Sequence, residues 1–169
     1  DTSFDPVFDD EVRAMAVSAD GNHLFVVGLF GTVNGVERRR VVKLDANGDT
    51  DPTFVAEAQA RTTALAVASD GSALYIGGFF DAMNGVPRGL LAEVDPVTGA
   101  TGPLDLPITE GLGPGANLKV ADLHLTPDNN TLLVIHTGAR VDGELREAIA
   151  LVDTQTNSLL PWQTDLYTE

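Results

Sequence analysis

The chain has 169 residues, of which 43% are hydrophobic, so it is long enough and apolar enough to bury a core as a single domain. Its formal net charge of −15 repels phosphate backbones and anionic lipid surfaces, which disfavours nucleic-acid and membrane-surface partners. It has no cysteine, which excludes a disulfide framework and a thiolate metal site, and no apolar run of about eighteen residues that could insert into a membrane.

The first unit, residues 5–54, has the signals of short strands joined by tight turns. An Asp20-Gly21 turn follows the first apolar run, and Asn34-Gly35 marks a hairpin, because a type I′ turn needs positive φ at both central residues. We expect strands at three apolar runs and a shorter fourth strand at the joint with the next unit: Val12–Ser18, Leu24–Gly28, Val41–Leu44 and the segment around Phe54.

The second unit, residues 55–104, repeats the first at an offset of fifty residues, so that Ala14–Gly21 falls on Ala64–Gly71. Without any gap, the same offset matches Leu24 with Leu74, Gly28 with Gly78, Phe30 with Phe80, Asn34-Gly35-Val36 with Asn84-Gly85-Val86, Arg38 with Arg88, and Asp45 with Asp95. A constant offset over so many matched residues does not arise by chance. An internal repeat of this period predicts a stack of similar supersecondary units.

One segment of the second unit conflicts with this interpretation. Phe54–Ala68 is rich in alanine and favours a helix on propensity alone. Its equivalent, Phe4–Ser18, contains Pro6 and the acidic run Asp9–Glu11. Because equivalent segments of a repeat share a fold, we expect a strand from Thr62 onward, preceded by a turn of helix.

The third unit, residues 105–162, keeps the internal spacing after a glycine-rich insertion around Ile108–Lys119, which we place between repeats. The matching positions are Asp128, Leu132, Asp142-Gly143, Arg146 and Asp153. The joints also recur, with Phe4, Phe54, Leu104 and Trp162 at corresponding places. We expect residues 163–169 to begin a further repeat.

Several strands are apolar on both faces, including Leu24–Val27, Leu132–Ile135 and Ala148–Val152. Such strands need cover on both sides, which a sheet between two neighbouring sheets has. We therefore predict an all-β fold, a β-propeller segment of three consecutive blades with three to four antiparallel strands each. Since propellers close with about four to eight blades, we expect further blades from a parent chain or from self-association to complete the ring.

The repeated pattern resembles the bacterial delta-sixty-type β-propeller repeats. The resemblance is carried by Ala16–Gly21, Leu24–Phe30, Val33–Val36, Leu44-Asp45 and Asp51–Phe54. The third unit departs from it, with His136 in place of Gly28 and Gly78, and Gly138 in place of Phe30 and Phe80. The resemblance implies the propeller fold and an extracytoplasmic location in a secreted or surface protein, but no particular chemistry.

Two groups of polar residues resemble binding sites but are explained better by a structural role. Arg38, Arg88 and Arg146, with Asp45, Asp95 and Asp153, recur in every unit, which favours a role inside each blade, with the arginine tying turn carbonyls or an aspartate. The loop Asp45, Asn47, Asp49 and Asp51 alternates oxygen ligands as calcium loops do, but its glycine stands fourth and no carboxylate stands twelfth. We interpret it as a solvated turn and leave weak calcium binding open.

The best site candidate is the pair Asp122 and His124, which replaces the alanines Ala64 and Ala66 of the second unit. Residues two apart on a strand share a face, and the first strand of a blade usually lines the central channel. A carboxylate there can orient a histidine for proton transfer. The alternative is that the two side chains face channel water or satisfy each other.

No catalytic motif, cofactor motif or metal-ligand spacing is present, so we expect no cofactor and no metal. The expected function is a non-enzymatic binding or scaffolding module of a secreted or cell-surface bacterial protein, with a protein or glycan ligand. A propeller hydrolase of a sugar or ester, with Asp122 in the channel and Ile108–Lys119 as a lid, is the first alternative. An architectural spacer is the second.

Overall fold

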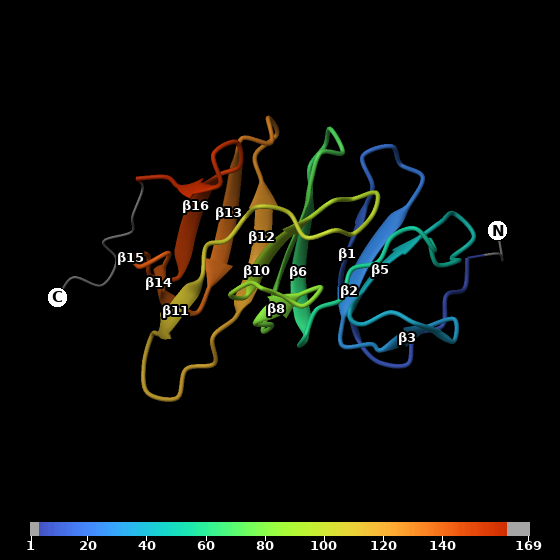
Figure 1. The fold of residues 1–169 in the computed structure, drawn as a ribbon, viewed down its shortest axis with the longest axis horizontal. Coiled ribbons are helices and arrows are strands. Elements are labelled where there is room, and N and C mark those ends of the chain that lie inside the picture. Colours follow the sequence, from blue (N-terminus) through green and yellow to red (C-terminus); the bar gives the residue numbers. More distant parts are fainter. Residues whose placement is uncertain (1–3, 162–169) are drawn as a thin grey trace.

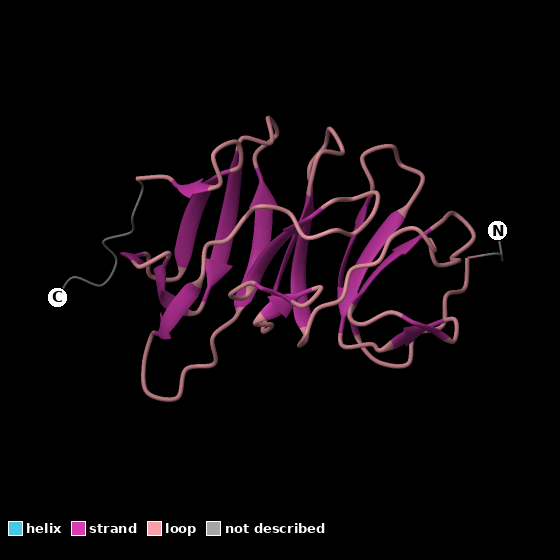
Figure 2. Cartoon of the chain, viewed as in Figure 1, coloured by secondary structure: helices cyan, strands magenta, loops and turns pink. Residues whose placement is uncertain are grey.

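The computed structural model describes residues 4–161, and within this range it contains strands and loops but no helix (Figure 2). It follows that no helix among these residues could cross a membrane. Trp162 and the expected start of a further repeat at residues 163–169 lie outside the described residues. The chain forms the predicted all-β structure.

Three antiparallel sheets follow one another along the chain (Figure 1). Blade 1 has the order β1-β2-β5, with bounds Val12–Val17, Leu24–Gly28 and Val41–Leu44. Blade 2 has the order β6-β7-β10, with bounds Thr62–Val67, Leu74–Gly78 and Leu91–Val94. Blade 3 has the order β12-β13-β16-β17, with bounds Val120–Leu125, Thr131–His136, Ile149–Asp153 and Ser158–Leu159.

The fourth strand of each blade is very short and lies before the expected position. In blades 1 and 2 it is a single bridge, from Thr50 to Leu44 and from Thr101 to Val94. In blade 3 it is the two-residue strand β17. Phe54 lies outside this strand, and its side chain is buried between blades 1 and 2.

Each blade also carries a small hairpin at one end. The hairpin strands are β3 (Thr32–Val33) with β4 (Val36–Glu37), β8 (Ala82–Met83) with β9 (Val86–Pro87), and β14 (Gly138–Val141) with β15 (Glu144–Leu145). The tips have φ of 52° and 76° at Asn34 and Gly35, with similar values in the other two units. The predicted type I′ turns are confirmed.

The insertion of the third unit begins later than expected. Ile108 lies fifty residues after Ala58 and pairs with Val141 as Ala58 pairs with Met83. Ile108–Gly111 is strand β11, which extends the hairpin sheet through β14. The added residues therefore lie inside the unit, between this strand and β12, and the first part of the expected lid is a paired strand.

The expected turn of helix before Thr62 is absent. The amide of Ala58 donates to the carbonyl of Arg39, and the amide of Gln59 donates to the carbonyl of Ala82. These backbone groups bond to neighbouring elements rather than to carbonyls four residues earlier. The alanines Ala56 and Ala58 are buried between blades, so the small side chains serve packing, and the repeat predicts the structure better than propensity does.

The blades stack side by side, from blade 1 (blue) through blade 2 (green) to blade 3 (orange and red) in Figure 1. Phe25 and Val27 of blade 1 share a core cluster with Leu74 and Ile76 of blade 2. A second cluster joins blade 2 to blade 3. Strand β6 contacts both β1 and β12, so the first strands of the three blades are neighbours. Strands with two apolar faces thus obtain cover on both sides, as predicted.

Candidate functional site

The repeated arginines hold each blade together. One guanidinium nitrogen of each donates to the preceding residue's carbonyl, and another donates across the joint, to Asp51 in blade 1, Gly102 in blade 2 and Leu160 in blade 3. The contact is equivalent in all three units. The prediction that Arg38, Arg88 and Arg146 tie turn carbonyls is confirmed, and they form no common binding ring.

The repeated aspartates close turns. Asp45 accepts the amides of Asn47 and Asp49, and Asp95 and Asp153 accept equivalent amides in their own units. These backbone hydrogen bonds lower the pKa of all three carboxyls. The aspartates therefore stay charged at neutral pH in a role that belongs to the turn.

The loop from Asp45 to Asp51 does not assemble calcium ligands. Asp51 forms an ion pair with Lys43 at 3.0 Å and accepts hydrogen bonds from Thr53. Burial favours a higher pKa for Asp51, but these partners outweigh it and lower the pKa to about 2. Within residues 4–161 no three acidic or histidine side chains are placed to hold one metal ion.

Asp122 and His124 are brought together, with 3.1 Å between the carboxylate and Nε2, and both are exposed. Their cross-strand partners are Ile135 and Leu133. At the same positions in blade 2, Ala64 is buried against blade 3. The pair therefore lies on the sheet face that blades 1 and 2 use for packing, and the two side chains contact each other.

A cavity of about 420 Å³ opens between blades 1 and 2, at the end of the strands where β1 turns into β2. We call it the seam pocket. It is lined by Ser18, Ala19, Asp20, His23, Phe25, Lys43, Val67, Ser69, Asp70, Gly71, Pro96 and Val97. Its volume falls in the range of small-ligand sites, about 300–1,000 Å³.

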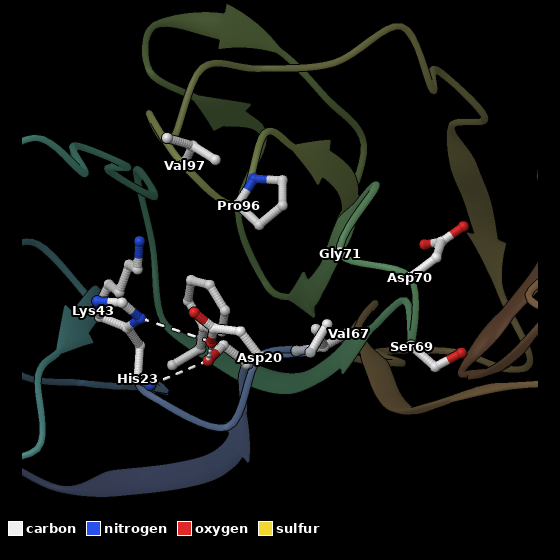
Figure 3. A pocket seen from close by; sticks show the side chains of 12 residues that line it. Asp20, His23, Lys43, Val67, Ser69, Asp70, Gly71, Pro96 and Val97 are labelled. Carbon is white, nitrogen blue, oxygen red and sulfur yellow. Dashed lines mark hydrogen bonds and ion pairs between the residues drawn. The ribbon is translucent and has the colours of Figure 1, made fainter.

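The two sides of the seam pocket differ in chemistry (Figure 3). Asp20, His23 and Lys43 come from blade 1 and lie together on one side. Pro96 and Val97 come from the turn after β10 and lie on the other side. The pocket therefore opposes a polar wall, with hydrogen-bond acceptors and donors, to an apolar wall.

The polar wall is positioned by local hydrogen bonds. Asp20 accepts the Ser18 hydroxyl and the amide of Asn22, and these bonds lower its pKa. The imidazole Nδ1 of His23 lies 3.7 Å from the Asp20 carboxylate. The Lys43 ammonium is held by Asp51, so its charge is compensated while its remaining N–H groups are still donors.

The turns beside the seam pocket lack the side-chain hydrogen bonds that join the turns of blades 2 and 3. Between blades 2 and 3, Ser69 and Asn129 exchange hydrogen bonds from side chain to side chain. At the equivalent places of the first seam stand Ala19 and Gly71, which have no side-chain polar groups. Sequence analysis missed this site. The only sequence signal was the loss of polar residues at one pair of repeat positions.

An all-β chain of successive antiparallel sheets stacked face to face, each built from one sequence repeat, is a partial β-propeller. Residues 22–54 match the model of a family described as a domain of unknown function (DUF5122) beta-propeller. The match supports a bacterial β-propeller repeat family. No curated protein matches the sequence.

Among solved structures, the chain is similar to one described as dihydro-heme d1 dehydrogenase NirN in complex with DHE. The identity is 11% and the TM-score is 0.43. The match covers 90% of this chain and 37% of the other, so this chain spans little more than a third of that protein's length.

Proposed function

We propose that the chain is a non-enzymatic binding module whose seam pocket takes one or two sugar residues of a glycan. The observation that carries this proposal is the pairing of a polar wall with an apolar wall in a cavity of about 420 Å³. A pyranose has the same division, because its hydroxyl groups lie at the ring edge and its C–H groups form an apolar face.

The two walls meet both needs of a sugar. Asp20 accepts hydrogen bonds from hydroxyl groups, and the Lys43 ammonium and the His23 imidazole donate to hydroxyl oxygens. The C–H face would pack against Pro96 and Val97. Because the polar groups are already held by their neighbours, little side-chain entropy is lost when the sugar binds.

The test is calorimetric titration with a panel of neutral and amino-substituted mono- and disaccharides. We expect at least one sugar to bind the wild-type chain, and Val67→Trp, which fills the pocket floor, to weaken that binding at least tenfold, or by about 1.4 kcal/mol. Val97→Asp, at an exposed position of the apolar wall, should weaken it as well.

The repeat offers a matched control for the filling variant. Val17 is the equivalent of Val67 in blade 1, but it is 59% exposed and lies outside the pocket. Val17→Trp should therefore leave sugar binding unchanged. A panel without any binder, or binding to a lysine-rich peptide in place of every sugar, would rule out the glycan proposal.

The proposal extends to the setting of the module. We also propose that the module belongs to a secreted or cell-surface protein and to the delta-sixty-type repeats; the match of residues 22–54 supports the propeller repeat. The face of blade 1 that points away from blade 2 exposes Met15 and Val17, and we propose that further blades cover it. Asp122 does not line the seam pocket, so this pocket does not support the hydrolase alternative.

A further inference from the structure

A second cavity, of about 470 Å³, lies at the opposite end of the seam between blades 1 and 2. Its lining comes from residues just before β1, β5 and β6 and just after β2 and β7, whereas the seam pocket lies at the other ends of these strands. The lining residues are Asp10, Leu29, Arg40, Gln59, Ala60, Arg61 and Phe79. We call it the basal pocket.

The basal pocket gathers positive charge on a chain whose net charge is −15. Arg40 and Arg61 line it, and Lys119 lies beside it, with its ammonium 5.8 Å from the centre of the Phe79 ring. Among residues 4–161, none of these three cations forms an ion pair with a carboxylate, whereas Arg13, Arg39 and Arg140 each do.

Both arginines are held in place before any ligand arrives. The Arg61 guanidinium stacks on the Phe79 ring at 3.7 Å from its centre. Arg40 donates one hydrogen bond to the carbonyl of Ala58 and keeps its other N–H groups for a ligand. Stacking leaves the edge of a guanidinium, which carries its donors, free for a planar or tetrahedral oxyanion.

The repeat indicates that this arrangement is particular to this seam. Arg61 and Lys119 stand at equivalent positions of the second and third units, where the first unit has Glu11. Phe79 is replaced by Leu29 in the first unit and by Thr137 in the third. Among residues 4–161, an aromatic ring in contact with two cations therefore occurs only at Phe79.

We propose that the basal pocket binds an oxyanion, namely a sulfate, phosphate or carboxylate group, through Arg40, Arg61 and Lys119. Asp10 also lines the pocket and accepts the amide of Glu11, so one carboxylate faces the two lining arginines, with Lys119 beside them. The net charge of the lining remains positive. This site is independent of the seam pocket and does not require a sugar.

The test is calorimetric titration of the whole chain at low ionic strength with inorganic phosphate, sulfate and acetate in separate arms. We expect one anion per chain, with an affinity that falls as sodium chloride is added. Arg61→Gln and Lys119→Gln should each weaken binding about tenfold, because each removes a charged donor. The affinities of the three arms distinguish a tetrahedral group from a carboxylate.

The matched control is Arg140→Gln, which removes the same charge from an arginine that is paired with Glu110 in the third unit. It should leave the anion affinity unchanged. The proposal is overturned if none of the three anions binds at millimolar concentration. It is equally overturned if Arg61→Gln and Lys119→Gln weaken binding no more than Arg140→Gln does.

Discussion

Phe54→Ala should lower the free energy of unfolding by about 3–5 kcal/mol, the usual cost of emptying a buried phenylalanine site. The Phe54 side chain is fully buried between blades 1 and 2, and its ring lies 5.5 Å from that of Phe25. The substitution removes packing from two blades at once and leaves a cavity between rigid sheets, which cannot collapse around it. Urea unfolding followed by circular dichroism measures the loss.

The repeat again supplies the control. Phe4 is the equivalent joint residue of the first unit, but it is 46% exposed, because no blade precedes blade 1 within the structure. Phe4→Ala should therefore change the unfolding free energy by no more than about 0.5 kcal/mol. Equal losses for the two variants would contradict the packing of Phe54 between blades.

Acid should destabilise the chain from about pH 6.5 downward through His136. This side chain is 3% exposed, and burial lowers its pKa to about 4. Between these two pH values the unfolded chain binds a proton that the folded chain excludes, so stability falls as the pH falls. A difference of about 2.5 pKa units corresponds to about 3 kcal/mol at full extent.

His136→Gln removes the titrating group and isolates its effect. The variant should show a flatter stability profile between pH 6.5 and 4, measured by urea unfolding at several pH values. Glu93, whose pKa is raised by burial, changes stability in the opposite direction, but it is present in both proteins and cancels in the comparison. Parallel profiles for the two proteins would show that His136 is not buried in its neutral form.

The strands and turns could be predicted because they are set by local residues that recur. Asn34-Gly35 and Asn84-Gly85 fix their hairpins through positive φ, and the register of fifty residues fixes the blades. The asparagines do more than turn the chain. Asn34 also bonds the amide of Val7 and the carbonyl of Gly48, which ties the hairpin to both joints.

The candidate site could not be predicted, because it depends on contacts between units. Ala19 and Gly71 meet at the seam of blades 1 and 2, beside the seam pocket. Ser69 and Asn129 meet at the seam of blades 2 and 3 and bond to each other. The difference between the two seams involves residues of two units each, so no single unit contains it. The orientation of the Asp122 side chain also depends on contacts beyond its own strand. Strand periodicity shows that Asp122 and His124 share a face, but only the pairing with β13 shows which face it is.

The third unit has His136 where the first two have glycine, although the strand pairing at this position is equivalent in all three. A Cβ at Gly28 would lie 2.1 Å from the carbonyl oxygen of Glu11, and one at Gly78 would lie 2.4 Å from that of Arg61. Glycine is therefore required in blades 1 and 2. In blade 3 the His136 side chain is buried, and its Nδ1 accepts the amide of Gly138.

The central claim is that successive units pack as neighbouring blades with their first turns side by side. A Cβ at Gly71 would lie 3.5 Å from that of Ala19, which is within the range of a disulfide, about 3.5–4.5 Å. In this cysteine-free chain, Ala19→Cys with Gly71→Cys should form an intrachain disulfide on mild oxidation, despite some strain from the φ of +74° at Gly71. Mass spectrometry after thiol alkylation should then find neither thiol modified. Two alkylated thiols, or disulfides only between chains, would contradict the stacking of blades 1 and 2.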